Sequence, residues 1–141
     1  MRIPPAHAHG GREILLIEDD PALAVMYRIK LLAEGYRVRL AADGPSGLAA
    51  TLACPPDLLL LDIRLPGFDG LELLARFRQA PGGDAVPVLV LSNYCERDVI
   101  DRGLELGVLG HLIKSQTTPA SLVEAIREHL LDRGAGAPAP G

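Results

Sequence analysis

The chain has 141 residues, of which 48% are hydrophobic, and its formal net charge is −4. This length is typical of one domain with a sizeable core. Acidic and basic residues are spread along the chain without a basic stripe, which argues against binding of DNA or RNA by this chain alone. No segment approaches the roughly 18 to 20 apolar residues that a membrane helix needs, so we expect a soluble protein without membrane association.

The two cysteines, Cys54 and Cys95, are not spaced like metal ligands and are too few for a disulfide scaffold. We therefore expect reduced thiols and a cytoplasmic location. Residues 1–12 are rich in proline and glycine and lack an apolar core of the signal-peptide type, which predicts a flexible leader. Its histidines, His7 and His9, are interpreted as part of this leader and not as a metal site.

Five short apolar runs alternate with helical patterns along the middle of the chain. Strands are predicted at 13–17, 36–41, 58–61, 86–91 and 108–113, and the second alternates apolar and polar residues like an edge strand. Helices are predicted at 21–34, 47–53, 71–79, about 96–106 and 119–131. The closing segment 132–141 is rich in proline, glycine and alanine, which predicts a flexible tail or a truncated linker.

This alternation predicts an α/β domain at 13–131, with a parallel five-stranded sheet and helices on both faces. Right-handed crossovers make the strands point the same way, and ligands of such sheets bind beyond the carboxyl ends of the strands. Polar residues follow four of the strands at that edge, namely Glu18, Asp19 and Asp20, then Asp62, Ser92 and Lys114.

Acids gathered at one edge repel one another unless a cation binds there, and hard oxygen ligands suit Mg²⁺. Lys114 as a point charge and Ser92 as a hydrogen-bond donor are groups that suit a phosphoryl oxygen. Asp62 is then the candidate nucleophile, because carboxylates form covalent phosphoryl intermediates. Taken singly, each residue has a plain alternative: a turn acid, a surface salt bridge or a helix cap.

The segments ILLIEDDP, LLLLDIRLPGFDG, VLVLSN and HLIK, in this order and at this spacing, resemble the receiver domain of two-component response regulators. The resemblance covers roughly Glu13 to Leu131 and implies a doubly wound, flavodoxin-like sheet with strand order 2-1-3-4-5. It implies that Glu18 and Asp19 hold Mg²⁺ together with Asp62 and the main-chain carbonyl of Arg64.

By the same resemblance, Asp62 is the phosphoacceptor, and Ser92 and Lys114 bind the phosphoryl group. The donor would be a phosphohistidine of a sensor histidine kinase or phosphotransfer protein, and the group would later be lost by hydrolysis. Such a domain catalyses its own phosphorylation and dephosphorylation and is not a conventional metabolic enzyme. It would switch binding to a downstream effector protein, and a homodimer is compatible with this role.

Several positions depart from the family pattern. Ser115 follows Lys114 where the family commonly has proline, which leaves open whether this peptide bond is cis. His111 stands at the aromatic switch position that acts together with Ser92. A histidine there changes its charge between about pH 5 and 8, which suggests a switch; a half-exposed strand residue is the plain alternative.

Two further residues, Asn93 and Tyr94, follow the strand-end serine. Arg64 and Tyr94 are placed to flank the path of water toward Asp62, with Asn93 adding bulk. We hypothesise that they slow hydrolysis of the phosphorylated aspartate.

Three other classes of protein have this architecture and are alternatives. A flavodoxin-like cofactor binder would need phosphate-binding Gly, Ser or Thr residues after the first strand, where this chain has acids. An aspartyl-nucleophile phosphatase would carry a second acid two residues after Asp62, where this chain has Arg64. The main alternative is a phosphorylation-independent receiver-like protein-interaction module, although such a module does not need an intact acidic site.

Overall fold

The computed structural model describes residues 11–93 and 96–136. In chain order the elements are β1 (Glu13–Ile17), α2 (Pro21–Ala33), β2 (Arg37–Ala41), α3 (Gly44–Ala53), β3 (Leu58–Asp62), α4 (Gly70–Gln79), β4 (Val88–Ser92), α5 (Arg97–Glu105), β5 (Gly110–Ile113), the 3₁₀ helix η1 (Lys114–Gln116) and α6 (Pro119–Gly136). The strands form one parallel sheet in the order β2-β1-β3-β4-β5. This confirms the predicted doubly wound, flavodoxin-like class.

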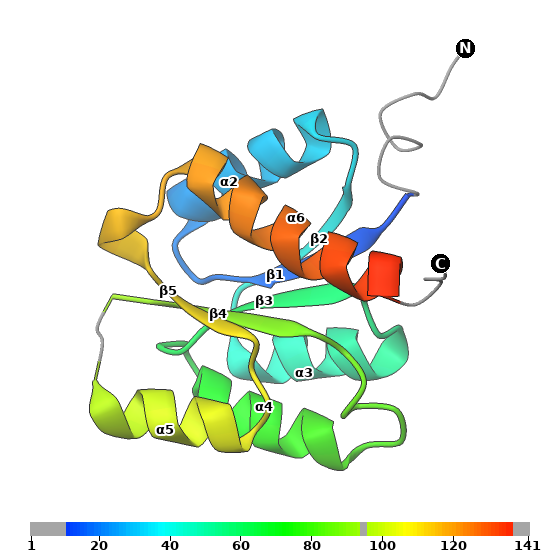
Figure 1. Ribbon diagram of the computed structural model, residues 1–141. Coiled ribbons are helices and arrows are strands. Elements are labelled where there is room, and N and C mark those ends of the chain that lie inside the picture. The colour runs from blue at the N-terminus through cyan, green and yellow to red at the C-terminus, as the bar shows by residue number, and fades with distance from the viewer. Residues whose placement is uncertain (1–10, 94–95, 137–141) are drawn as a thin grey trace.

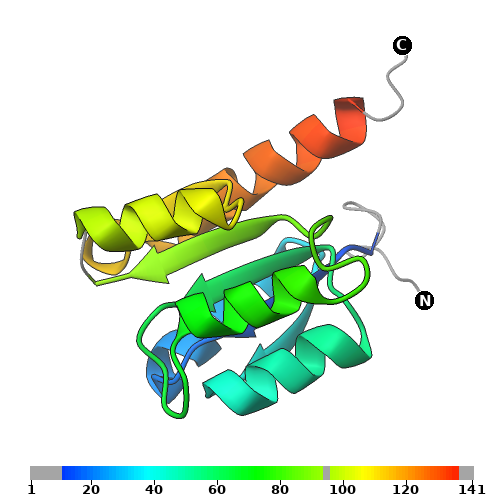
Figure 2. The ribbon, with the colours of Figure 1, turned by 90° about the horizontal axis from the view of Figure 1, so that it is seen from below.

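The sheet separates two hydrophobic cores. Leu16 and Leu60 belong to the core under α2 and α6, whereas Leu15 and Leu61 belong to the core under α3, α4 and α5. Figures 1 and 2 show these two helical layers on opposite faces of the sheet. Because β3 and β4 are buried on both faces, their apolar residues run continuously and do not alternate.

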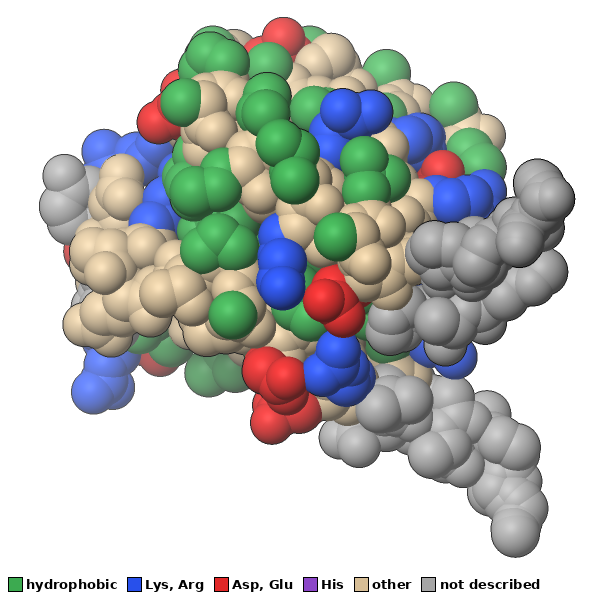
Figure 3. Space-filling model, turned by 90° about the horizontal axis from the view of Figure 1, so that it is seen from above, with side chains coloured by type: hydrophobic (Ala, Val, Ile, Leu, Met, Phe, Trp, Pro, Cys, Tyr) green, Lys and Arg blue, Asp and Glu red, His purple; other side chains and the backbone are tan. Residues whose placement is uncertain are grey.

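The outer face of α2 is unusually apolar. Val25, Met26, Ile29 and Leu32 are between 40% and 62% exposed, and Figure 3 shows hydrophobic side chains gathered on the surface formed by α2 and α6. Since apolar residues occur on both sides of this helix, its sequence periodicity alone does not show which side faces the sheet. None of the described helices has the length and apolar character required to cross a membrane.

Several element boundaries differ from the predicted ones. Helix α3 begins at Gly44, earlier than predicted, because the side chain of Asp43 accepts the Ser46 N–H and caps the helix start. Strand β5 begins only at Gly110, because the Val108 N–H still donates to the Gly103 carbonyl of α5 at 3.0 Å. Helix α6 runs past the predicted end at 131 to residue 136, because a glycine costs a helix only about 1 kcal/mol and proline comes later.

The last residues of the predicted leader contact the domain. The Arg12 guanidinium donates a hydrogen bond to the Leu130 carbonyl at 2.9 Å, and Arg37 Nε donates to the carbonyl of Gly11 at 2.6 Å. The rest of the predicted leader, including His7 and His9, lies outside the described residues, as do Tyr94, Cys95 and the segment 137–141. The domain boundaries at 13 and 131 stay a prediction.

Helix α4 begins in close contact with the end of β3. The Gly70 N–H donates to the Ile63 carbonyl at 2.7 Å. A β-carbon added at Gly70 would lie 2.2 Å from the carbonyl oxygen of Asp62, far inside van der Waals contact. Glycine at this position therefore allows the helix to start directly beside the strand end.

We expect Gly70→Ala to lower the free energy of unfolding by about 2 kcal/mol, because the new methyl group must displace the main chain at Asp62. Gly103→Ala, inside α5, is the matched control: its added carbon would meet only the two methyl groups of Val108, at 3.3 and 3.8 Å. Urea unfolding measures both variants. If both variants lose equally little free energy of unfolding, the main chain at Asp62 makes room for the new methyl group at Gly70 without loss of stability.

Candidate functional site

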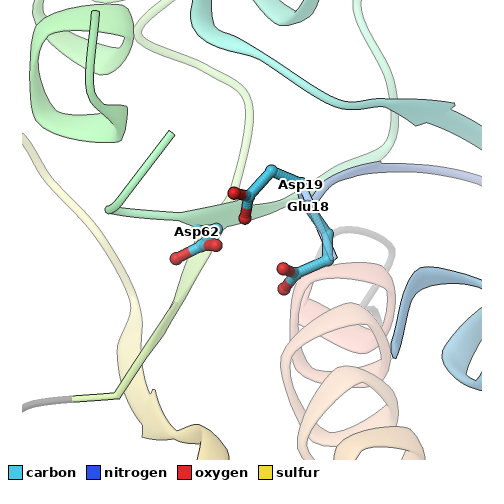
Figure 4. A group of neighbouring side chains, drawn as sticks. All are labelled: Glu18, Asp19 and Asp62. Atoms are coloured by element: carbon cyan, nitrogen blue, oxygen red, sulfur yellow. The ribbon is translucent and has the colours of Figure 1, made fainter. Parts of the chain in front are cut away.

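The acids predicted at the strand ends lie together at the carboxyl edge of the sheet. Glu18 and Asp19 follow β1, and Asp62 ends the neighbouring strand β3. One carboxylate oxygen from each of these three residues lies within 4.8 Å of the other two. Figure 4 shows the three side chains turned toward a shared space.

Burial divides these acids into two kinds. Glu18 and Asp62 are each 2% exposed, whereas Asp19 is exposed to solvent. A cleft of about 480 Å³ opens next to them, and Asn93 and Ser115 contribute to its lining. A small anionic group can therefore reach the buried carboxylates from this side.

Asp20, the third acid of the run, has a separate role. Its Oδ1 accepts the N–H groups of Ala22 at 3.0 Å and Leu23 at 3.2 Å, so it caps the start of α2. The cap explains why the sequence has three consecutive acids although only Glu18 and Asp19 join Asp62 in the cluster.

Lys114 bridges the two buried acids. Its Nζ lies 2.8 Å from Glu18 Oε1 and 2.8 Å from Asp62 Oδ2, and its side chain is only 11% exposed. Main-chain groups hold the remaining oxygens: the Asp20 N–H donates to Glu18 Oε2 at 3.1 Å, and the Arg64 N–H donates to Asp62 Oδ1 at 3.2 Å. Sequence reasoning placed Lys114 beside a phosphoryl oxygen and did not foresee this pairing with Glu18.

Burial is the main influence on the ionisation of these groups. It raises the pKa of Glu18 and of Asp62, although the hydrogen bonds from Lys114 act in the opposite direction. Burial by itself would lower the pKa of Lys114, but the hydrogen bonds and negative charges of Asp62 and Glu18 together outweigh it and raise that pKa. The lysine thus stays charged and offsets only part of the cost of burying two carboxylates.

We expect Asp62→Asn to be more stable than the wild type in EDTA. The substitution removes a buried charge whose desolvation is not fully offset, and a gain of about 1 kcal/mol corresponds to several degrees in melting temperature. Asp19→Asn should act in the same direction but less, because Asp19 is exposed. A lower melting temperature for both variants at neutral pH would mean that the acids are structural caps.

The stability gain should also depend on pH. A carboxyl group with a raised pKa contributes stability at low pH that is lost as the pH rises through the folded-state pKa. Since the pKa of Asp62 is raised, the melting-temperature difference between Asp62→Asn and wild type should be largest at neutral pH. It should shrink as the pH falls and the wild-type carboxyl takes up its proton.

The other predicted residues surround this centre. Ser92 ends β4 and is 3% exposed, and His111 is a half-buried residue of β5 that pairs with Val90. No peptide bond among the described residues is cis, so the bond from Lys114 to Ser115 is trans. The shielding role suggested for Tyr94 concerns a residue outside the described ones.

Residues 14–127 match the family model of the response regulator receiver domain. A curated relative is the phosphate regulon transcriptional regulatory protein PhoB of Rhizobium meliloti (strain 1021), to which the chain is 36% identical over 107 residues. The match covers 76% of this chain and 47% of that protein, so the chain spans about half the length of this relative.

Two solved structures extend the comparison. A response regulator receiver domain protein from Methanospirillum hungatei JF-1 superimposes with a TM-score of 0.80 at 29% identity, covering 89% of this chain and 98% of that one. The receiver domain of the sensor histidine kinase PA1611 from Pseudomonas aeruginosa PAO1 gives a TM-score of 0.77 at 30% identity, covering 85% and 98% of the two chains. The matched segment includes the acidic cluster and Lys114, and the chain belongs to the family of response regulator receiver domains of two-component systems.

Proposed function

We propose that this domain accepts a phosphoryl group on Asp62 from a phosphohistidine of a sensor histidine kinase or a phosphotransfer protein. The observation that carries the proposal is the bridged pair of buried acids, Glu18 and Asp62, around Lys114 at the side of an open cleft. A turn acid or a helix cap does not need a second buried carboxylate and a shared ammonium group. Phosphorylation would then change the affinity for a downstream effector protein.

The acidic cluster suits Mg²⁺. Glu18, Asp19 and Asp62 each offer a carboxylate oxygen within a space of 4.8 Å, and hard oxygen donors are the ligands that this ion prefers. The main-chain carbonyl of Arg64 is the further ligand that the family resemblance implies. The receiver domain of PA1611 was solved with a magnesium ion coordinated in its active-site cleft. When bound, Mg²⁺ would offset negative charge on the reacting phosphoryl oxygens.

The proposed transfer exchanges one bond to phosphorus for another. A carboxylate oxygen of Asp62 attacks the phosphorus, the P–O bond forms, and the P–N bond of the donor breaks with its electron pair going to the imidazole nitrogen. The contacts from Lys114 Nζ and the Arg64 N–H fix the orientation of the carboxylate before the attack.

After transfer, we assign the phosphoryl oxygens to Lys114 and Ser92. Lys114 lies 2.8 Å from Asp62 Oδ2, so its ammonium group is close to the place where the new phosphate forms. Ser92 ends the strand next to β3, and its hydroxyl can donate one hydrogen bond. Hydrolysis by water would later return Asp62 to its free form and end the signal.

Three finer points are part of this proposal. We place the domain in the cytoplasm, and we propose a protein partner, not DNA, as the direct target of this chain. A homodimer is a further state that phosphorylation could favour. We assign His111 and Ser92 to the switch between the effector affinities of the unphosphorylated and phosphorylated forms.

Phosphotransfer to the purified protein tests the proposal. The protein is incubated with acetyl phosphate, and separately with a phosphohistidine-bearing phosphotransfer protein, in Mg²⁺ or in EDTA, and its intact mass is measured. We expect a phosphorylated product in Mg²⁺ and little in EDTA. An unmodified mass with both donors would favour the phosphorylation-independent interaction module instead.

A further inference from the structure

Arg64 connects the candidate phosphoacceptor to helix α5. Its main-chain N–H donates to Asp62 Oδ1, and its side chain contributes to the lining of the acidic cleft. At its far end, Nη2 lies 3.9 Å from Oε1 of Glu96, the residue that precedes α5. The two side chains are 65% and 52% exposed, so this ion pair is weak.

The start of helix α5 has few buried contacts: the half-buried Val99 of its first turn packs against the core under α3, α4 and α5. Gly103 is its only buried residue, whereas α4 has four. Glu96 occupies the N-cap position but makes no side-chain capping hydrogen bond. The pair with Arg64 therefore adds to a small set of contacts that hold the first turn of α5.

The other end of α5 is fixed. Arg78 of α4 donates hydrogen bonds from Nε to the Leu106 carbonyl at 2.7 Å and from Nη2 to the Gly107 carbonyl at 3.3 Å. Its Nη1 donates to the carbonyls of Gly83 and Val86, both at 2.8 Å. A helix fixed at its end and weakly held at its start can pivot about the fixed end.

We propose that the Arg64 side chain is a latch: it pairs with Glu96 in the unphosphorylated domain and turns to the phosphoryl group on Asp62 after transfer, which releases the start of α5. This inference rests on the proposed function of Asp62. A phosphoryl group carries up to two negative charges and matches a guanidinium bidentately, whereas an exposed carboxylate partner contributes less than about 1 kcal/mol. The phosphoryl group therefore wins the competition for Arg64.

A double-mutant cycle measures this competition, with beryllium fluoride in Mg²⁺ as the phosphoryl analogue and calorimetric titration as the readout. Glu96→Gln should tighten binding of the analogue about two- to fivefold, because the carboxylate that competes with the analogue for the Arg64 guanidinium has lost its charge. In the Arg64→Gln background, which keeps the main-chain carbonyl, Glu96→Gln should have no effect. Glu105→Gln, another exposed acid of α5 in an ion pair, is the charge-matched control and should leave the affinity unchanged.

Amide hydrogen exchange of the first turn of α5 supplies the second readout. Wild type should exchange faster at the amide of Ile100, which donates to the Glu96 carbonyl, when the analogue is bound, whereas Glu96→Gln should exchange fast with or without it. If Glu96→Gln changes the analogue affinity equally with and without Arg64, general charge repulsion explains the effect. That result would overturn the latch. Failure of the wild type to bind the analogue at all would instead overturn the proposed function.

Discussion

Asp62→Asn is expected to slow phosphorylation by acetyl phosphate or by a phosphohistidine donor about a thousandfold or more, judged from the loss of nucleophiles in other enzymes. The amide oxygen carries no full negative charge and cannot replace the carboxylate as an attacking group. Mass spectrometry of the protein incubated with donor and Mg²⁺ gives the rate.

The slower phosphorylation of Asp62→Asn must be distinguished from a loss of folded protein. Asp62→Asn should melt above the wild type in EDTA, so an inactive but more stable variant would assign the defect to chemistry. Asp101→Asn, at an exposed position of α5, is the control and should be phosphorylated at the wild-type rate. A phosphorylated Asp62→Asn protein formed at the wild-type rate would place the phosphoacceptor elsewhere in the chain.

Lys114→Met should lower the free energy of unfolding of the metal-free protein by about 3 kcal/mol, because two buried carboxylates lose their shared cation. The loss should be smaller in Mg²⁺, since an ion bound by the same acids would replace part of the missing charge. Urea unfolding in EDTA and in Mg²⁺ measures both effects.

Two comparisons make this prediction specific to the site. Lys30→Met removes a lysine whose pair with Glu34, at 3.5 Å, is more exposed, and should cost at most about 0.5 kcal/mol. Adding Asp62→Asn to Lys114→Met should restore stability, because one of the two uncompensated charges is then gone. An additive double variant would show that Lys114 and Asp62 do not interact as described.

The strands are the part of the fold that the sequence shows most directly. The apolar runs before Glu18, Asp62 and Ser92 are continuous because each strand is buried on both faces, and this signal does not depend on distant residues. The start of β5 and the end of helix α6 were harder to predict, because hydrogen bonds to other elements and a tolerated glycine decide these boundaries.

By itself, the sequence determined that acids, a hydroxyl and a lysine meet at one edge, because parallel strands bring their carboxyl ends together whatever their side chains do. Only the tertiary structure decided which of these groups touch. Lys114 reaches Glu18 and Asp62 across separations of 96 and 52 residues, and Arg64 meets Glu96 beyond the end of another strand. Such contacts depend on strand register, burial and side-chain rotamers, which are settled only when the whole sheet and its helices pack together.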